Sequence, residues 1–364
     1  MVRDGIIFQN AVFVDHWQFF WSENYNALYK RELVTGEICR LSAYADYEKA
    51  AYTKLVRYKR KLIAIPSAAD KIMVFDLDTE EFRYSETGIP EMEDNGGNSE
   101  KFYGCVEKDN WLFMIGCKTA HILKFDMEAE KTAGYLDLHR ELSEKADGMG
   151  YFREGVVFEE KVLVPALYEN SVFEVDIENL RYSRKTFSNT GKGFSLIYRA
   201  DSQIWLFPFD RGEIIIWDGK KEIVSRYNID GFIHFKRNSR NFLAAYLMEG
   251  KLWIIPRMAN KVLAFDFAEK QFYENNAVNA YFAGIDKEIS GISSERLGEN
   301  ILLLTACTDR LILYNTLKDE IELICNNLIP DDDFMRFLWK RRKMAVVAEK
   351  DICLMDFIKF VEAL

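Results

Sequence analysis

KLIAIPSAADKIMVFD (residues 61–76) holds the pattern that decides the fold: two short apolar runs, separated by a polar turn and closed by an aspartate. Three segments follow it closely: KVLVPALYENSVFEVD (161–176), QIWLFPFDRGEIIIWD (203–218) and KLWIIPRMANKVLAFD (251–266). Looser copies are WLFMIGCKTAHILKFD (111–126), NILLLTACTDRLILYN (300–315) and KMAVVAEKDICLMD (343–356). An eighth is WQFFWSENYNALYKR (17–31), where Arg31 stands in place of the aspartate.

The closing residue recurs about every 47 positions, a period typical of repeat architectures. The series is Asp76, Asp126, Asp176, Asp218, Asp266, Asn315 and Asp356. The side chain is predicted to accept backbone N–H bonds in the turn that follows the second run. A ring of acidic side chains with a shared function is the less favoured interpretation.

The apolar runs favour β-strands, because they are short and rich in Ile, Val, Leu, Phe, Tyr and Trp. Two such runs around a short turn indicate a hairpin. The first run ends on a proline in four copies, which marks the exit of the strand into the turn. These prolines are Pro66, Pro165, Pro208 and Pro256.

Each hairpin is flanked by two further short stretches. Examples are YTKLVRYKR (52–60) upstream and EFRYSE (81–86) downstream of the first quoted copy. Four strands per repeat, in the order A-B-C-D, predict an all-β fold: a β-propeller of four-stranded antiparallel blades. Eight hairpins favour eight blades, with seven as the alternative, and residues 1–364 are expected to form a single domain.

The composition limits the classes of partner. With 48 basic and 58 acidic residues the formal net charge is −10, which argues against nucleic acid and anionic membranes as general partners. The six cysteines lie singly and form no CxxC pair, so reduced thiols are expected. No signal peptide and no long apolar segment stand out, which predicts a cytoplasmic protein without membrane insertion.

No catalytic, cofactor or metal constellation emerges from the motifs. The four histidines are not spaced as a metal-binding pair, and no nucleophile elbow, phosphate-binding loop or dinucleotide fingerprint occurs. The prediction is therefore no catalytic residue, no cofactor and no metal.

The B–C turns and the D–A connections are expected to emerge on one rim of the ring, where function on repeat scaffolds tends to lie. Arginine binds carboxylate and phosphate through paired donors, and aromatic side chains can stack on sugar or base rings. The alternative is that turns are simply polar, with acidic neighbours neutralising the cations. The candidate ligand-binding residues are Arg211, Arg257, Arg310, Lys118, Lys192, Arg237, Tyr168 and Trp21.

The motif of an apolar run, Ile-Pro, a turn and a second run ending in Phe-Asp resembles the repeats of kelch-like and YncE-like bacterial β-propellers. The resemblance covers most of the chain. The kelch double glycine occurs only as Gly96 and Gly97, and Trp-Asp occurs once as Trp217 and Asp218. The resemblance implies the fold, whereas propellers host enzymes, sensors and scaffolds alike.

The sequence thus predicts a non-enzymatic binding or scaffold propeller. Its rim would recognise a partner protein, or an anionic small molecule or glycan. The alternative is an enzyme, of a lyase or glycosyl-processing type, with a carboxylate or histidine pair converging over the central channel. A purely structural subunit is a third reading.

Overall fold

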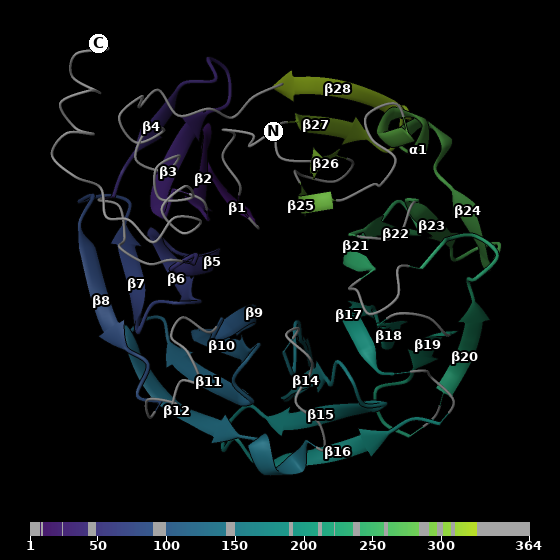
Figure 1. The fold of residues 1–364 in the computed structure, drawn as a ribbon, viewed down its shortest axis with the longest axis horizontal. Helices are drawn as coiled ribbons and strands as arrows, with labels where there is room; N and C mark the ends of the chain where they lie inside the picture. Colours follow the sequence, from purple (N-terminus) through teal and green to yellow (C-terminus); the bar gives the residue numbers. More distant parts are fainter. Residues whose placement is uncertain are drawn as a thin grey trace, which may run out of the picture.

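The computed structural model describes most of the chain up to residue 325. The described residues are 8, 10–23, 25–42, 49–89, 100–142, 150–188, 192–209, 213–221, 223–235, 241–257, 261–283, 291–296, 301–306 and 310–325. They form seven four-stranded antiparallel sheets, and in each sheet the strands are neighbours in chain order. The sheets stand around a central axis, with the first strand of each innermost and the fourth outermost (Figure 1).

The strand bounds repeat with little variation. The first two sheets are β1 (Ala11–Val14), β2 (Trp17–Ser22), β3 (Ala27–Glu32) and β4 (Ile38–Arg40), then β5 (Tyr52–Tyr58), β6 (Lys61–Pro66), β7 (Lys71–Asp76) and β8 (Phe82–Glu86). The third and fourth are β9 (Phe102–Lys108), β10 (Trp111–Gly116), β11 (His121–Asp126) and β12 (Lys131–Asp137), then β13 (Val156–Phe158), β14 (Lys161–Pro165), β15 (Ser171–Asp176) and β16 (Tyr182–Thr186).

The remaining sheets follow the same order. The fifth and sixth are β17 (Phe194–Ala200), β18 (Gln203–Pro208), β19 (Glu213–Trp217) and β20 (Ile223–Asn228), then β21 (Phe242–Met248), β22 (Lys251–Pro256), β23 (Leu263–Asp266) and β24 (Gln271–Glu274). The seventh is β25 (Gly291–Arg296), β26 (Ile301–Ala306), β27 (Arg310–Asn315) and β28 (Glu320–Cys325). The all-β fold class is therefore confirmed, and the copy at 343–356, on which the expectation of eight blades depends, lies outside the described residues.

Seven of the eight predicted hairpins are the second and third strands of these sheets. The four prolines end β6, β14, β18 and β22, as expected from the missing N–H. We call the side that carries the turns between second and third strands the B–C rim, and the opposite side the A–B rim.

Short helices supplement the sheets. The 3-10 helix η1 (His139–Glu141) follows β12, and α1 (Asn276–Ala283) follows β24. The Val278 N–H donates to Oδ1 of Asn275 (2.7 Å), which caps the first turn of α1. No helix among the described residues is long and apolar enough to cross a bilayer.

The apolar core lies between adjacent sheets. Six clusters of buried side chains join the first sheet to the second and so on to the seventh, each with members from both neighbours. A large aromatic often sits at the centre, such as Trp205, which is fully buried between the fifth and sixth sheets. Because a sheet buries both faces, its middle strands read as continuous apolar runs.

The repeated aspartates act as predicted. The side-chain Oδ1 accepts the backbone N–H groups two and three positions later, at 2.8 to 3.1 Å. The described members of the series are Asp76, Asp126, Asp176, Asp218, Asp266 and Asn315. The backbone bonds lower the pKa of the Asp76 carboxyl, because they favour its charged form.

The first repeat needs a correction. Glu32, not Arg31, occupies the aspartate position, because it pairs with the first residue of β2 as Asp76 pairs with the first residue of β6. The Thr35 N–H donates to the Glu32 carboxylate, so the longer side chain caps the same turn. Arg31 is buried instead.

Candidate functional site

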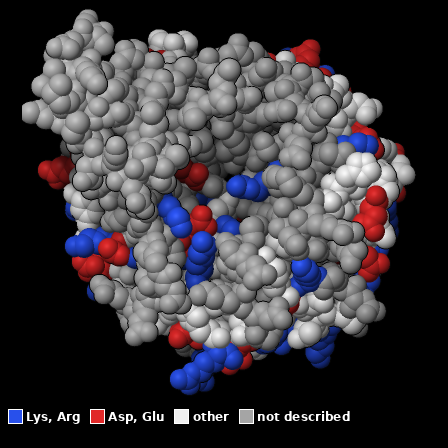
Figure 2. Space-filling model, in the orientation of Figure 1, with Lys and Arg blue, Asp and Glu red and all other residues white. Residues whose placement is uncertain are grey.

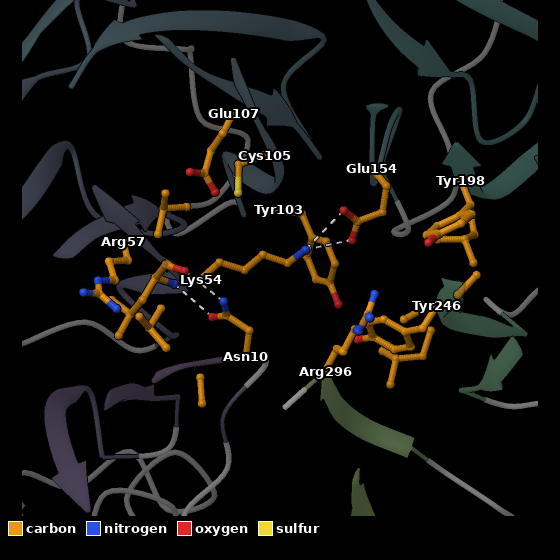
Figure 3. A pocket seen from close by; sticks show the side chains of 18 of the residues that line it. Asn10, Lys54, Arg57, Tyr103, Cys105, Glu107, Glu154, Tyr198, Tyr246 and Arg296 are labelled. Carbon is orange, nitrogen blue, oxygen red and sulfur yellow. Dashed lines mark hydrogen bonds and ion pairs between the residues drawn. The ribbon is translucent and has the colours of Figure 1, made fainter. Parts of the chain in front are cut away.

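A cavity of about 530 Å³ lies at the centre of the ring. Its polar walls come from the innermost strands and the residues just before them, so sheets far apart in the chain meet there (Figure 3). The polar lining residues are Asn10, Lys54, Arg57, Tyr103, Cys105, Glu107, Glu154, Tyr198, Tyr246 and Arg296. Pockets of this size hold small organic molecules in many proteins.

The cavity contains an ion pair between the second and fourth sheets. Lys54 on β5 donates from Nζ to both carboxylate oxygens of Glu154, at 2.9 and 3.1 Å (Figure 3). The two side chains are only 19% and 14% exposed. Although burial works against the charged ammonium, the Glu154 carboxylate outweighs it and raises the pKa of Lys54.

Tyr103 on β9 lies between several cations. The Arg153 guanidinium carbon is 4.4 Å from the centre of its ring, and the Lys54 ammonium is 5.7 Å away. Arg257, in the B–C turn of the sixth sheet, donates from Nη1 to the Tyr103 hydroxyl (3.4 Å). Tyr103 is thus contacted by cationic side chains from three parts of the ring: Lys54, Arg153 and Arg257.

Gly104 makes this arrangement possible. A Cβ at this position would lie 2.0 Å from the backbone oxygen of Arg153. The missing side chain lets the segment before β13 pack directly against β9, which brings Arg153 over Tyr103 and Glu154 toward Lys54.

Three arginines near the A–B rim each link an inner strand to the preceding sheet. Each sits near the end of an inner strand and donates from Nη1 to a backbone oxygen of the preceding sheet. The pairs are Arg57 with Phe13 (3.3 Å), Arg199 with Val157 (3.2 Å) and Arg296 with Leu247 (3.2 Å). These hydrogen bonds fix the three guanidinium groups at this end of the channel, where Glu107 on β9 supplies a carboxyl group.

Glu107 and Cys105 on β9 also face the cavity (Figure 3). The protein around Glu107 raises the pKa of its carboxyl, since desolvation disfavours the anion. Burial likewise raises the pKa of the Cys105 thiol to about 12. Cys105 is therefore a protonated thiol at neutral pH and a weak nucleophile.

The predicted site residues fall in different places. Arg257 contacts Tyr103, which lines the central cavity. Lys118 lies in the B–C turn of the third sheet, where its backbone N–H donates to the backbone oxygen of Glu100. Lys192 lies 6.0 Å from the ring of Tyr168, which contacts Phe209. These sit on the B–C side of the fourth and fifth sheets.

The remaining predicted residues lie elsewhere. Trp21 is buried in the core between the first and second sheets, edge-on to Tyr52, and donates to Asn26. Arg310 begins β27 and its side chain is not described, whereas Arg211 and Arg237 lie outside the described residues.

The face seen along the axis is hollowed at its centre, and basic and acidic side chains both border this hollow (Figure 2). Sequence reasoning placed the candidate site on the turns and missed Lys54, Tyr103, Glu107 and Glu154. A usable signal existed: a charged residue inside an otherwise apolar inner strand, as in YTKLVRY (52–58) and FYGCVEK (102–108).

Two of the four histidines lie close together in the structure. His121 and His139 lie together with Asp137, with ring centroids 4.9 Å apart. Strand register explains this proximity, because His121 on β11 pairs directly with Asp137 at the end of β12.

Comparison with known proteins supports the fold. No protein-family model matches the chain, and no curated protein does. A solved streptogramin B lyase structure has a TM-score of 0.64 at 14% identity, over 88% of this chain and 95% of that one. The selenomethionine-substituted virginiamycin B lyase from Staphylococcus aureus has a TM-score of 0.61 at 14% identity, over 84% of this chain and 93% of that one.

A third structure is the extracellular domain of the putative one-component system BT4673 from B. thetaiotaomicron. Its TM-score is 0.57 at 12% identity, over 83% of this chain and 40% of that one. The neighbours thus include an enzyme and the extracellular domain of a putative one-component system. At these identities the likeness concerns the fold alone, and the fold of this chain is that of a β-propeller.

Proposed function

We propose that the protein is a binding propeller whose central channel takes a small organic anion that carries a ring. The observation that carries this proposal is the cavity of about 530 Å³ lined by Lys54, Arg57 and Arg296 together with three tyrosines. The site predicted on the rim is moved inward, with Arg257 as the link between the B–C rim and the channel.

The charges and shapes of the lining favour such a ligand. Three basic side chains and two acidic ones line the cavity, and one of the acidic ones, Glu154, is already paired with Lys54. Guanidinium groups bind carboxylate or phosphate through paired donors. Tyr198 and Tyr246 offer apolar faces for a ring, as aromatic walls do in many small-molecule sites.

The state of the nucleophiles favours binding over covalent catalysis. A lysine that attacks carbonyl groups needs a lowered pKa, yet the ion pair with Glu154 raises that of Lys54. A reactive cysteine also needs a lowered pKa, whereas that of Cys105 is raised to about 12. Both groups are held in their protonated forms.

An acid–base enzyme at the same cavity is the second candidate. Glu107 favours it, because a carboxyl group with a raised pKa can donate a proton. A glycosidase would need a second carboxylate, and Glu154 is held by Lys54. The lyase activity named for two of the similar structures is a property of those proteins.

Four predictions from the sequence also belong to this proposal. They are a kelch-like or YncE-like relationship, a cytoplasmic bacterial location, a single domain over 1–364, and a partner protein or glycan as the alternative ligand at the rim.

A thermal-shift screen followed by calorimetry tests the proposal. Aromatic carboxylates, uronic acids and sugar phosphates are offered to the wild type, and the best binder is titrated into Arg257→Met and Lys54→Met. We expect the affinity to fall by about tenfold or more in each, since a charged contact contributes roughly 1.5–3 kcal/mol. Lys131→Met, on the exposed outer strand β12, is the matched control and should bind like the wild type.

Two results would contradict the binding site: no stabilisation by any compound, or equal affinity in all variants. Mass spectrometry of the ligand after incubation separates the candidates, because a binder returns it unchanged. Conversion that is lost in Glu107→Gln would favour the enzyme.

A further inference from the structure

Two histidines and one aspartate meet at the outer edge of the third sheet. His121 begins β11, Asp137 ends β12, and His139 lies in η1. One ligand atom from each lies within 4.8 Å of the others. The group is separate from the central cavity, and the proposed function uses none of its members.

His121 is the unusual member. Its side chain is 7% exposed, and Nδ1 is a buried nitrogen without a hydrogen-bond partner among the described residues. Nε2 lies 4.0 Å from Oδ1 of Asp137, which is too long for a hydrogen bond. Buried polar groups in folded proteins are nearly always hydrogen-bonded, so an imidazole left in this state needs another explanation.

The other two members are more accessible and already oriented. Asp137 Oδ1 accepts the backbone N–H of His139 (2.9 Å) and contacts its Nδ1 (2.7 Å). The imidazoles are also held by aromatic edges: Tyr135 is 5.5 Å from His121, and Tyr151 is 5.6 Å from His139. Asp137 and His139 are 55% and 30% exposed, so a solute can reach the group from outside.

We propose that His121, Asp137 and His139 form a binding site for a divalent transition metal such as Zn²⁺. Imidazole nitrogens and a carboxylate oxygen are ligands that Zn²⁺ favours, and three protein ligands leave a position for water or another small ligand. The metal contacts Nε2 of His121, the ring nitrogen nearest the Asp137 carboxylate, and it ties β11 to the end of β12. Nε2 of His121 and Oδ1 of Asp137, which lie 4.0 Å apart, are then two ligands of the same ion.

Binding changes the hydrogen bonds of His139. The Ala120 N–H donates to Nε2 of His139 at 3.3 Å, which leaves the ring proton on Nδ1 for Asp137. A metal on Nδ1 replaces that proton, and the neutral ring then carries its proton on Nε2. Metal binding therefore breaks the long hydrogen bond from the Ala120 N–H to His139. The chemical shift of the Ala120 amide then detects the bound metal.

Calorimetry of the tag-free, EDTA-treated chain with ZnSO₄ is the direct test. We expect one Zn²⁺ per chain in the wild type. Binding should be weaker by about tenfold or more in the double variant His121→Asn, His139→Gln, because two of three protein ligands are gone. His234→Asn, at a surface position in another sheet connection, is the matched control and should keep the wild-type affinity.

An absence of Zn²⁺ binding in the wild type, or unchanged binding in the double variant, overturns the site. If circular dichroism shows that the double variant is unfolded, two measurements on the wild type decide instead. Zn²⁺ should shift the Ala120 amide resonance and slow the modification of His139 by diethyl pyrocarbonate. If saturation with Zn²⁺ causes neither of these changes, the proposal is refuted as well.

Discussion

The ion pair between Lys54 and Glu154 gives a quantitative prediction about the channel. Glu154→Gln leaves the ammonium of Lys54 in a cavity without its carboxylate. Removing one partner of a buried pair costs about 3–5 kcal/mol. Both side chains keep some exposure to the cavity, so we expect the lower end, about 3 kcal/mol in the free energy of unfolding.

The expected shift in melting temperature follows from the chain length. With 364 residues, the entropy of unfolding is large, and about 3 kcal/mol lowers Tm by about 4 °C. The assay is thermal unfolding by calorimetry of the wild type, Glu154→Gln, Lys54→Met and the double variant. Lys54→Met in combination with Glu154→Gln should recover part of the loss, because no charge is then left unpaired.

The pH dependence has a defined sign. The pKa of Lys54 is raised in the folded state, so its stabilisation is fully present below the unfolded pKa of about 10.4. It is lost as the pH rises through the folded pKa, above that value. Single variants that melt within about 1 °C of the wild type, with additive effects in the double variant, would refute this account of the pair.

Three further predictions concern the fold. Gly104→Ala should lower the unfolding free energy by more than about 2 kcal/mol, because its Cβ would lie 2.0 Å from the Arg153 oxygen, and chemical denaturation measures this. Asp126→Ala should cost about 1 kcal/mol in the same assay, since two backbone N–H groups lose their acceptor. Cys105 should react slowly with iodoacetamide at pH 8, because burial raises the pKa of its thiol to about 12, and peptide mass spectrometry follows the labelling.

Each of these predictions has its own control. Gly231→Ala introduces a Cβ with nothing within 4 Å and should be mild, so equal losses at Gly104 and Gly231 would contradict the packing argument. Asp126→Asn should stay close to the wild type, because Asn315 caps the equivalent turn with an amide. Labelling of Cys105 that is as fast in the native as in the unfolded chain would show that the thiol is not protected.

The turns show what local sequence can reveal about function. A role for the repeated aspartates in capping was predictable, since donor and acceptor lie two or three residues apart. The closing position of the first repeat was assigned to Arg31, one residue too early, and only strand pairing, with Trp17 opposite Glu32, sets its register. Trp21 shows the converse problem: an aromatic residue near a turn was read as a surface side chain and is a core residue.

The sequence by itself determined the repeat, the hairpins, the prolines at the strand ends and the capping aspartates. These depend on periodicity and on contacts between residues close in the chain, which are written locally. Only the tertiary structure decided the site. Lys54 and Glu154 are 100 positions apart and Arg257 and Tyr103 are 154 apart, so the circular arrangement of the sheets, not any motif, brings these side chains together.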